Sequence, residues 1–400
     1  MKSSRGIQAL LVDPSLFTAP YDAALTDGLL SVGVDVMWAT RPTRQGDRQV
    51  LPASRMDPFF YRGVDETPRL PPALRGLAKG ASHILGLCAL VWRVLARKPD
   101  VVHFQWTVVP CLDALAICAI RLLRPVVLTV HDPVPFNGER RAWLQTWGFD
   151  LPIRLANRVI VHTQAGRSTL IERGVPAAKI VVIPHGPLSL AVPLPESNPR
   201  ERRANDGRWT FLLFGEIKAY KGTDLLIEAL GLLPELVRQR ARVIVAGRPQ
   251  MDLGPIKQRM EALGLSDVVE IRARRLSEEE MAALFAETDC FVFPYRQIDA
   301  SGVYFLVKSL GKWVIASRVG VFTEDLQEGT QGTLVTPGDV RALADALEFA
   351  LQTRPSATPP KSEDTWAAIG RATKELYAKV MASGETSRPR FFRSLGSRGR

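Results

Sequence analysis

Cysteine is scarce and unpatterned in this 400-residue chain. The four cysteines, Cys88, Cys111, Cys118 and Cys290, form no CxxC pair, and each lies in an apolar run. This spacing gives no support to a disulfide framework or a cysteine metal site. We expect four buried free thiols in a protein of a reducing compartment.

Long apolar runs are also missing. The longest candidate, from Ile84 to Leu95, is interrupted by Arg93 and is shorter than the ~18–20 residues that a membrane-spanning helix needs. The first apolar run, in MKSSRGIQALLVD, stops at Asp13, which indicates a first β-strand rather than a signal peptide. We expect a soluble or peripheral protein in the cytoplasm, with the inner face of the plasma membrane as the alternative location.

Motifs for metals and common cofactors are absent as well. The five histidines are scattered, and none pairs with cysteine or another histidine at ligand spacing. The chain has no P-loop, no GxGxxG and no nucleophile elbow of a Ser-His-Asp hydrolase. We therefore expect neither a metal nor a cofactor.

Basic residues outnumber acidic ones and give a net charge of +11. Nucleic acid, an anionic membrane face and phosphate-bearing substrates are the partners that such a charge suits. No nucleic-acid-binding motif accompanies the charge, so nucleic acid is not expected as a partner. The arginine-rich segment 62–98 has an apolar face formed by Ile84, Leu87, Cys88, Val91 and Leu95. That face either docks on an anionic bilayer or packs on the core of the protein.

Short β-branched runs alternate with helical patterns in the first half of the chain. This alternation is typical of a parallel sheet that is covered by helices on both faces. Residues 41–80 break the rhythm with many arginines and prolines and are expected to form a long loop with short helical pieces. The expected strands are Ile7–Val12, Val34–Ala39, Val101–Phe104, Val126–Val130, Val159–His162 and Ile180–Pro184.

A second series of strands and helices follows and predicts two tandem Rossmann-like domains. The domain boundaries are expected at 1–190 and 209–360, with a linker at 191–208 that is rich in proline and polar residues. An amphipathic helix within 361–383 is expected to pack back on the first domain, and the basic tail 384–400 to be disordered. The strands of the second series are expected at Trp209–Phe214, Arg242–Ala246, Val268–Ile271, Cys290–Phe293, Trp313–Ala316 and Gly332–Val335.

The segment FGEIKAYKG places two lysines in a turn between a strand and a helix. Gly215 allows the backbone to pass close to a ligand. Lys218 and Lys221 precede the helix, where free N–H groups and the helix dipole favour an anion such as a diphosphate. Taken alone, two lysines in a surface turn also fit a solvated face.

The segment DASGVYFLVKSLGKW places a second anion-receptive turn after a later strand. The amides of Ser301, Gly302 and Val303 and the Ser301 hydroxyl are candidate phosphate donors, while a plain N-capping serine is the alternative. Both turns end parallel strands of one domain, and open α/β sheets bind ligands at that edge. Together they suit one diphosphate.

These segments, with the later GTLVTPGDVRALADAL, resemble the donor domain of family 4 glycosyltransferases over residues 209–350. The first half resembles the family through DVVHFQW, VVLTVHDPVP, RVIVHTQ and VVIPHGP. The resemblance implies the GT-B fold, an active site between the domains, retention at the anomeric carbon and no obligatory metal. It also implies that Lys218 and Lys221 hold the donor diphosphate, that residues 301–303 grip the phosphates, and that Glu324 lies in the donor segment.

The chain departs from the family at the two glutamates that many members carry eight residues apart. The corresponding positions are Ile298 and Leu306, neither of which is acidic. Asp299 is adjacent and is expected to replace the first carboxylate near the donor sugar. This departure leaves room for reduced activity.

In the first domain, His131 resembles the family's histidine near the donor sugar and is an expected catalytic residue. The other expected catalytic residues, Lys221 and Asp299, belong to the second domain. Asp132 either orients His131 or binds acceptor. A Gly-Gly turn of the family is replaced by residues that include Tyr21 and Asp22. The other acceptor candidates at strand ends are His103, Gln105, Trp106, His162 and His185.

The expected reaction is transfer of a sugar from a nucleotide diphosphate sugar, with UDP or GDP, to a saccharide or a lipid-linked saccharide. One alternative keeps the fold but makes the protein a nucleotide-sugar epimerase, for which no convincing carboxylate set is present. The other is a partner subunit that has lost activity.

Overall fold

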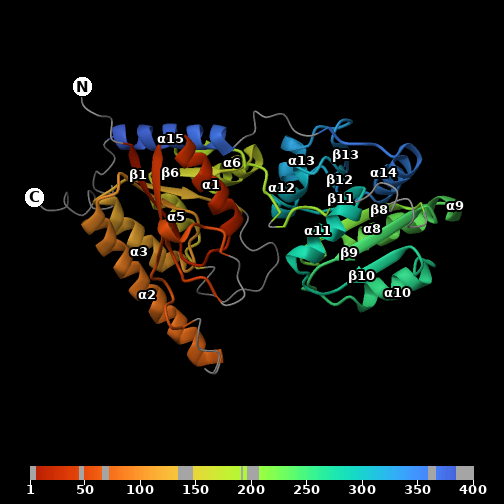
Figure 1. Cartoon of the computed structure of the whole chain (residues 1–400), viewed down its shortest axis with the longest axis horizontal. Coiled ribbons are helices and arrows are strands. Elements are labelled where there is room, and N and C mark those ends of the chain that lie inside the picture. The colour runs from red at the N-terminus through yellow and green to blue at the C-terminus, as the bar shows by residue number, and fades with distance from the viewer. Residues whose placement is uncertain are drawn as a thin grey trace, which may run out of the picture. The chain divides into compact units, whose positions relative to one another are not determined.

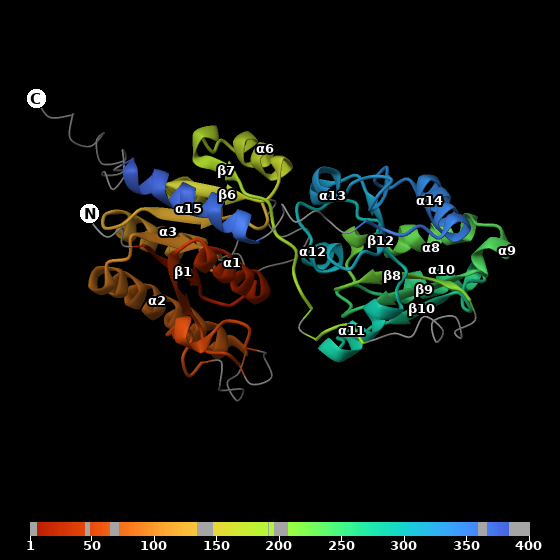
Figure 2. The same cartoon turned by 45° about the horizontal axis from the view of Figure 1, so that its top comes forward.

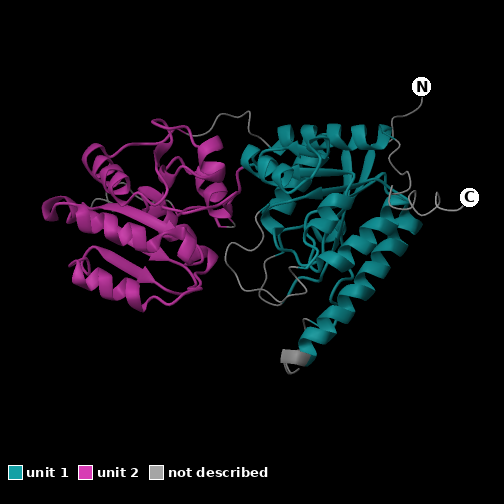
Figure 3. Ribbon diagram, turned by 180° about the vertical axis from the view of Figure 1, so that it is seen from behind, with its two compact units in different colours: residues 1–186, 363–400 teal, residues 187–362 magenta. Residues whose placement is uncertain are grey.

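The computed structural model describes residues 6–44, 49–64, 72–133, 147–190, 192–195, 207–358 and 366–383, with the side chains of residues 72 and 73 left out. The chain divides into two compact units (Figure 3). Unit 1 comprises residues 1–186 and 363–400, and unit 2 comprises residues 187–362.

Unit 1 is built on a parallel sheet of seven strands in the order β3-β2-β1-β4-β5-β6-β7. The strands are rich in Val, Leu and Ile because both faces of the sheet are covered. The direction of strand order reverses between β1 and β4, which is where such sheets bind ligands. The strands are β1 Ile7–Asp13, β2 Val34–Thr40, β3 Met56–Pro58, β4 Val101–Phe104, β5 Val126–Thr129, β6 Arg158–Val161 and β7 Ile180–Val182.

Helices cover both faces of this sheet. Side chains of α2, α3, α5 and α6 share one hydrophobic cluster with the sheet, and α1 and α15 pack together on the opposite side (Figures 1 and 2). The helices of unit 1 are α1 Ala19–Ser31, α2 Pro72–Arg97, α3 Pro110–Arg121, α5 Asp150–Leu155, α6 Gln164–Glu172 and α15 Trp366–Ala382, with short 3-10 helices η1 Ala53–Arg55 and η2 Ala177–Lys179.

The last helix, α15, belongs to unit 1 although it follows unit 2 in the sequence. It crosses α1 at two glycines, Gly28 and Gly370. A Cβ on Gly370 would collide with the carbonyl oxygen of Gly28, and a Cβ on Gly28 would collide with the carbonyl oxygen of Trp366. Only glycine allows this close approach of two helix backbones.

Unit 2 repeats the design with a parallel sheet of six strands in the order β10-β9-β8-β11-β12-β13. Its strand order reverses between β8 and β11. The strands are β8 Trp209–Phe214, β9 Ala241–Ala246, β10 Val269–Arg272, β11 Cys290–Phe293, β12 Trp313–Ser317 and β13 Gly332–Val335. The helices are η3 Ala219–Lys221, α8 Thr223–Leu232, α9 Glu235–Arg238, α10 Gly254–Ala262, α11 Glu278–Glu287, α12 Gly302–Lys308, α13 Gly320–Asp325 and α14 Val340–Thr353.

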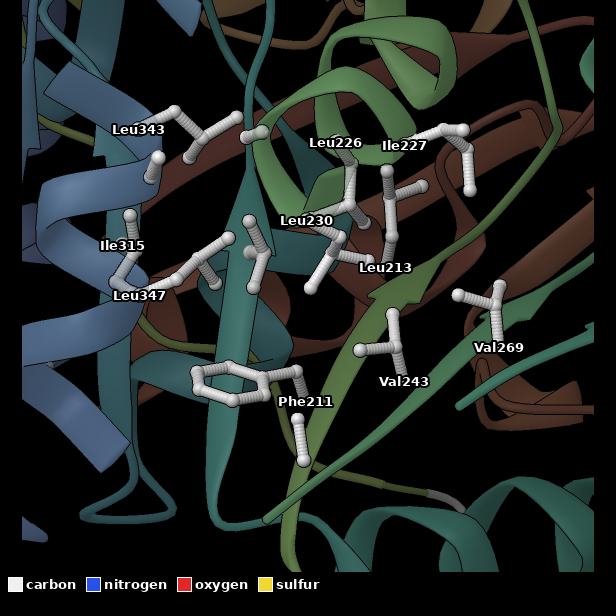
Figure 4. Packing of buried hydrophobic residues seen from close by; sticks show 14 of the residues in the cluster. Phe211, Leu213, Leu226, Ile227, Leu230, Val243, Val269, Ile315, Leu343 and Leu347 are labelled. Atoms are coloured by element: carbon white, nitrogen blue, oxygen red, sulfur yellow. The ribbon is translucent and has the colours of Figure 1, made fainter. Parts of the chain in front are cut away.

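The core of unit 2 lies between its sheet and the helices α8 and α14. Leu226 and Leu230 of α8 and Leu347 of α14 pack on strand residues such as Phe211 (Figure 4). These side chains are fully buried. This packing fixes the sheet, so the strand ends that carry polar residues are held in place.

Three expectations from the sequence were wrong. The segment 41–80 is not a loop with short helical pieces throughout, because it contains β3 and the first turns of α2. Of the four free thiols only Cys290 is buried, and Cys88 is exposed. The apolar run Ile84–Leu95 is part of the longer helix α2, which is long and apolar enough to cross a membrane by length and composition. The expected basic tail 384–400 and most of the expected linker lie outside the described residues.

Candidate functional site

The turn after β8 brings the predicted donor residues of unit 2 together. Gly215 has φ +106°, a left-handed conformation that favours glycine. A Cβ added to Gly215 would lie 2.8 Å from Nζ of Lys221 and 3.2 Å from Cγ2 of Val303. Gly215, Lys221 and Val303 therefore meet at one point, at the strand ends where the order of the sheet reverses.

Lys221 is buried, and no anionic side chain among the described residues pairs with it. Its relative exposure is 7%, and among the described residues none makes a hydrogen bond or ion pair with Nζ. Its charge lies 5.4 Å from the ring centre of Tyr295. Burial lowers the pKa of Lys221, and the nearby charge of Lys218 lowers it further. Buried lysines are nearly always paired in proteins, so this environment is suited to receiving an anion.

Lys218 differs from Lys221 because it has a partner in the structure. Its Nζ lies 3.0 Å from Oε2 of Glu216, and Glu216 also pairs with Arg248. The pKa of Glu216 is lowered; its partial burial opposes this, but hydrogen bonds from Lys218 and Arg248 outweigh the burial.

The turn that carries Lys221 is fixed to the end of β11. Gly222 packs so closely on Pro294 that a Cβ would collide with the proline carbonyl. The amide of Arg296 donates to the carbonyl of Tyr220 at 2.8 Å, and its guanidinium binds both oxygens of Asp224. These contacts hold Lys221 in register with the residues that follow β11.

Two buried hydroxyl groups beside Lys221 also lack partners. Thr223 Oγ1 and the Tyr295 hydroxyl make no hydrogen bond with the described residues. Burial raises the pKa of Tyr295, and the side chain of Ser301 opposes that rise without reaching a well-directed hydrogen bond. Lys221 and Ser301 thus both lie near Tyr295, and the two predicted anion-receptive turns share one site.

The residues around Ser301 form the other side of this site. Ser301 caps α12 by accepting from the amide of Tyr304 at 3.4 Å, which is the N-cap role foreseen as its alternative. Asp299 is 8% exposed, and its carbonyl accepts from the amide of Val321 at 2.7 Å. Glu324, which lies on helix α13 together with Val321, is exposed.

In unit 1, four of the five histidines gather at the ends of neighbouring strands. We call His103, His131, His162 and His185 the histidine cluster. Nε2 of His162 lies 3.2 Å from Nδ1 of His131, and the rings of His162 and His185 are 5.2 Å apart. Tyr21 packs on three of the rings, at centroid distances of 4.8 to 5.4 Å.

Burial favours the neutral form of three members of the histidine cluster. It lowers the pKa of His103 to about 3 and that of His162 to about 4, and it lowers the pKa of His131 well below its ordinary value. Nδ1 of His162 faces the carbonyl of Ile183 at 3.0 Å, so this nitrogen carries the proton. Nε2 of His162 must then accept from Nδ1 of His131.

Trp106 stacks on the other side of His131, and Gln105 lies beside the unprotonated Nε2 of the ring. Nε2 of His131 lies 3.2 Å from Oε1 of Gln105, and the Trp106 ring stacks on His131 at 5.1 Å with a 12° angle between planes. Nε1 of Trp106 donates to Thr18 at 2.9 Å, which in turn donates to Asp22 at 3.4 Å. Asp22 is fully buried, and burial and the negative charge of Asp13 raise its pKa well above the ordinary value.

A small cavity of about 80 Å³ opens beside His131. Its wall combines aromatic rings with a few polar groups, an arrangement that suits a sugar. Phe17 lies on its rim with 57% of its surface exposed. The cavity is lined by Phe17, Gln105, Trp106, His131, Asp132 and Phe149, among others. His103, in contrast, is turned inward to Tyr377 at 2.7 Å and to Thr129 at 2.8 Å.

Sequence reasoning missed one supporting pair. His83 of α2 is buried, with its ring nitrogens 2.8 Å from the Tyr61 hydroxyl and 3.0 Å from Asp113. The other carboxylate oxygen of Asp113 accepts from the amides of Val108 and Val109 at 2.7 Å. The pair thereby holds the loop that presents Trp106. No local pattern signals it, because the partners lie 30 residues apart in the sequence.

Neither unit contains a metal site within the described ranges, since no group of three or more His, Cys, Asp or Glu side chains is arranged to hold an ion. The predicted residues fall into two groups, one in each unit, and each group is called a half-site for the residues of its own unit only. Unit 2 presents cationic and hydroxyl groups, and unit 1 presents neutral imidazoles and aromatic rings.

Models of known protein families match both units. Residues 23–186 match Glycosyltransferase Family 4, and residues 196–370 match Glycosyl transferases group 1. A D-inositol 3-phosphate glycosyltransferase of an Arthrobacter species is 26% identical over 354 residues, covering 82% of this chain and 80% of that protein.

Two further proteins illustrate the range of the similarity. A GDP-mannose-dependent alpha-(1-6)-phosphatidylinositol monomannoside mannosyltransferase of Mycolicibacterium smegmatis is 33% identical over 156 residues; the match spans 37% of this chain and only 40% of the relative. The crystal structure of Anabaena HepE in complex with UDP and glucose has the same fold, with a TM-score of 0.63 and 18% identity over 98% of this chain and all of that chain.

Proposed function

The chain belongs to the family 4 glycosyltransferases and has the GT-B fold, and on that premise we propose a reaction and a role for each half-site. The protein transfers a sugar from a UDP- or GDP-sugar to a saccharide or lipid-linked saccharide. The configuration at the anomeric carbon is retained. Unit 2 binds the donor, and unit 1 binds the acceptor.

One observation supports donor binding above all: the buried, unpaired amine of Lys221. An isolated buried charge is costly, and the cost is offset when an oppositely charged ligand arrives. A diphosphate supplies that charge and has oxygen atoms for the unpartnered hydroxyl groups of Thr223 and Tyr295. Gly215 leaves the space beside Nζ that such a ligand needs.

Lys221 stabilises the leaving diphosphate in this proposal. Negative charge grows on the diphosphate as the bond to the sugar breaks, and a fixed cation in a buried site lowers the energy of that step. The amides of Gly302 and Val303 and the ion-paired Lys218 add further donors. The departing phosphate oxygen then takes the proton of the acceptor hydroxyl on the same face of the sugar, which yields retention.

His131 orients the reacting sugar in the proposal. The Trp106 ring fixes the imidazole by stacking, and the unprotonated Nε2 of the neutral ring can accept a hydrogen bond from a sugar hydroxyl. Oε1 of Gln105 faces Nε2, so a proton gained at that nitrogen would find an acceptor. Asp299, adjacent to the family's first glutamate position, binds hydroxyls of the donor sugar.

Binding and turnover test the proposal separately. Calorimetry with UDP-glucose and GDP-mannose measures donor affinity, and a radiolabelled donor reports transfer to saccharide acceptors. Proton NMR of the product reads the anomeric configuration, for which an inverted linkage contradicts the mechanism. Donor binding without hydrolysis or transfer would favour the inactive-subunit alternative. Absence of binding to either donor class would reject the assignment of Lys221.

A further inference from the structure

Two buried carboxyl groups meet where β1 turns into α1. Asp13 is the last residue of β1 and Asp22 lies in the first turn of α1, and both are fully buried. Their carboxyl groups are within hydrogen-bonding reach of each other. Thr18 bonds to both: its amide donates to Oδ2 of Asp13 at 3.4 Å, and its hydroxyl donates to Oδ1 of Asp22 at 3.4 Å. We call Asp13 and Asp22 the carboxyl pair.

The carboxyl pair lacks one hydrogen-bond donor. Oδ2 of Asp22 is buried, and no donor among the described residues reaches it. The group that faces the Asp22 carboxyl is itself an acceptor, the carboxyl of Asp13. Two carboxylates at this distance would repel each other strongly in a site without solvent. A single proton between them removes the repulsion and supplies the missing hydrogen bond.

The surroundings of the two groups favour Asp22 as the carrier of that proton. Both oxygens of Asp13 accept from backbone amides, from Ser15 at 3.1 Å and from Thr18 at 3.4 Å, and such bonds favour the ionised form. Burial raises the pKa of both carboxyl groups. The hydrogen bond from Asp22 and the backbone amides oppose the rise at Asp13, whereas the charge of Asp13 adds to the rise at Asp22. Asp13 is therefore the anion, near the positive end of the α1 dipole.

The loop between the two members of the pair is strained and needs such contacts. Leu16 has φ +51°, a left-handed conformation that costs energy in a residue other than glycine and persists only where the surroundings impose it. Asp13 holds this loop through the amides of Ser15 and Thr18. Nε of Arg41 holds it from outside by donating to the carbonyl of Ser15 at 2.9 Å.

The same loop shapes one wall of the cavity beside His131. Phe17 lines this cavity together with Trp106, and the two rings are 5.4 Å apart in an edge-to-face contact. Nε1 of Trp106 donates to the Thr18 hydroxyl at 2.9 Å. Thr18 therefore links buried Asp22 to the indole that stacks on His131.

We propose that Asp13 and Asp22 share one proton, carried by Asp22, and that the pair positions Phe17 and Trp106 at the cavity through the loop and Thr18. Asp22 is a positioning residue, because it acts on the cavity through other side chains. The effect on substrate rests on the proposed function, which assigns this cavity to the acceptor. The shared proton does not rest on that assignment, so the two parts are tested by different measurements.

Infrared difference spectra of the full chain at neutral pH test the proton. Asp22→Asn should remove the C=O stretching band of a protonated carboxylic acid. Asp27→Asn is the matched control at an exposed site of the same helix, and it should remove only a carboxylate band, because an exposed aspartate is ionised at this pH. Loss of a carboxylate band in Asp22→Asn as well would overturn the shared proton.

Two amide variants test which member carries the proton. Asp22→Asn keeps a donor toward Asp13 and an acceptor for the Thr18 hydroxyl. Asp13→Asn leaves a single carbonyl oxygen for the two amides of Ser15 and Thr18. The indole N–H resonance of Trp106, assigned with Trp106→Phe among the eight tryptophans, should therefore keep its position in Asp22→Asn and shift in Asp13→Asn. Equal shifts in both variants, or a larger one in Asp22→Asn, would overturn the assignment of the proton to Asp22.

Kinetics test the positioning role. Asp22→Ala should raise the acceptor KM by about tenfold, because the cavity wall loses its alignment, while donor affinity by calorimetry should stay unchanged. Asp22→Asn should restore the acceptor KM to within about twofold of the wild type. A partly unfolded protein would instead show a lower kcat with both KM values unchanged, and that result in Asp22→Ala would overturn the positioning role.

Thr18→Val keeps the test available if Asp22→Ala does not fold. It removes the hydroxyl that joins Asp22 to Trp106 and nearly conserves the shape of the side chain, so the acceptor KM should rise and the Trp106 resonance should shift. An unchanged KM and resonance in Thr18→Val would overturn the positioning role. If the wild type bound no donor and transferred no sugar, the proposed function would fail, whereas the infrared and resonance results would still decide the protonation of the pair.

Discussion

The carboxyl ends of the two sheets have the same topology but different electrical character. In unit 1 this edge carries the histidine cluster, in which burial lowers the pKa of His103, His131 and His162, and its aromatic neighbours. In unit 2 the edge carries an unpaired buried lysine, a second lysine and two unpartnered hydroxyl groups. Both edges lie where the strand order reverses, so the scaffold does not set the difference.

The residues directly after the strands decide what each edge can bind. Neutral imidazoles and indole rings can recognise a neutral sugar, since they offer hydrogen bonds and flat apolar faces without a net charge. A buried cation discriminates against such ligands and favours a diphosphate. Substituting the residues that define one edge should therefore weaken the binding of one ligand and leave the binding of the other unchanged.

The largest effect is expected from Lys221→Met, which keeps the apolar stem but removes the charge. Donor turnover should fall by about 100-fold or more, the range found when one transition-state donor is lost. Stability should be unchanged or higher, because an unpaired buried charge disappears. Donor affinity by calorimetry, kcat and KM by radiolabel transfer, and the thermal midpoint measure these effects.

Lys257→Met is the matched control for this exchange, because Lys257 is exposed on α10 of the same unit. It should leave turnover and affinity unchanged. If Lys221→Met kept full turnover, or lost activity only through unfolding, the contrast between the two edges would lose its basis.

The second prediction concerns acid, and it should affect unit 1 alone because unit 2 contains no histidine. His162 has a folded pKa of about 4 against an ordinary value near 6.5, so the unfolded chain binds the proton first as pH falls. The stability that neutral His162 contributes is fully present above pH 6.5 and declines below it. The loss is about 2 kcal/mol at pH 5 for one such group.

Buried Asp22 has the opposite effect on stability. Its raised pKa means that the folded state takes up this proton first, so mild acid stabilises the fold through Asp22. His162→Asn isolates the histidine because it keeps a donor for the Ile183 carbonyl. Hydrogen exchange of β4 to β6 in the wild type and the variant measures the difference. Between pH 7.5 and pH 5, the free energy of protection should fall less in the variant than in the wild type, by the amount given above for His162. The protection of β8 and β9 should not change in either protein. An identical loss in the two proteins would contradict a neutral, buried His162.

The fold could be predicted from the sequence where a strand is a run of mostly apolar residues. The segments Val101–Phe104, Trp209–Phe214 and Cys290–Phe293 have the expected bounds. The strand Met56–Pro58 was missed because its three residues, MDP, form no apolar run and are only half-buried. The first turns of α2 were missed because Gly76 and Gly80 dilute the helical pattern.

The candidate site could be predicted in its members but not in their states. Sequence order placed Lys218, Lys221 and Ser301 at strand ends, and the structure gathers them. It could not show which of the two lysines pairs with Glu216, because that depends on the conformation of the turn. The packing of three histidines on Tyr21 was equally invisible, since it joins segments separated by up to 164 residues in the sequence.

A smaller effect is expected from Gly215→Ala. The added methyl group would lie 2.8 Å from Nζ of Lys221, and φ +106° is strained for alanine. The amine must move out of line with a diphosphate, so donor affinity should fall about tenfold, or about 1.4 kcal/mol. Gly264→Ala, also at a left-handed glycine but far from Lys221 in the sequence, controls for strain alone and should not change donor affinity. Equal losses in both variants would assign the effect to the backbone rather than to Lys221.

The smallest effect is expected from Lys218→Met, and it sharpens the contrast within unit 2 itself. Lys218 already shares its charge with Glu216 at 3.0 Å, and such partly exposed ion pairs contribute about 0–1 kcal/mol. Donor affinity should therefore fall less than about fivefold, well short of the loss in Lys221→Met. The double variant Lys218→Met with Glu216→Gln should behave like the single one, because the carboxylate of Glu216 in the single variant is still neutralised by Arg248. Calorimetry of donor binding to these two variants and to Lys221→Met shows which change costs the most affinity. A larger loss from Lys218→Met would make the exposed lysine the main diphosphate ligand and would leave the burial of Lys221 without a functional explanation.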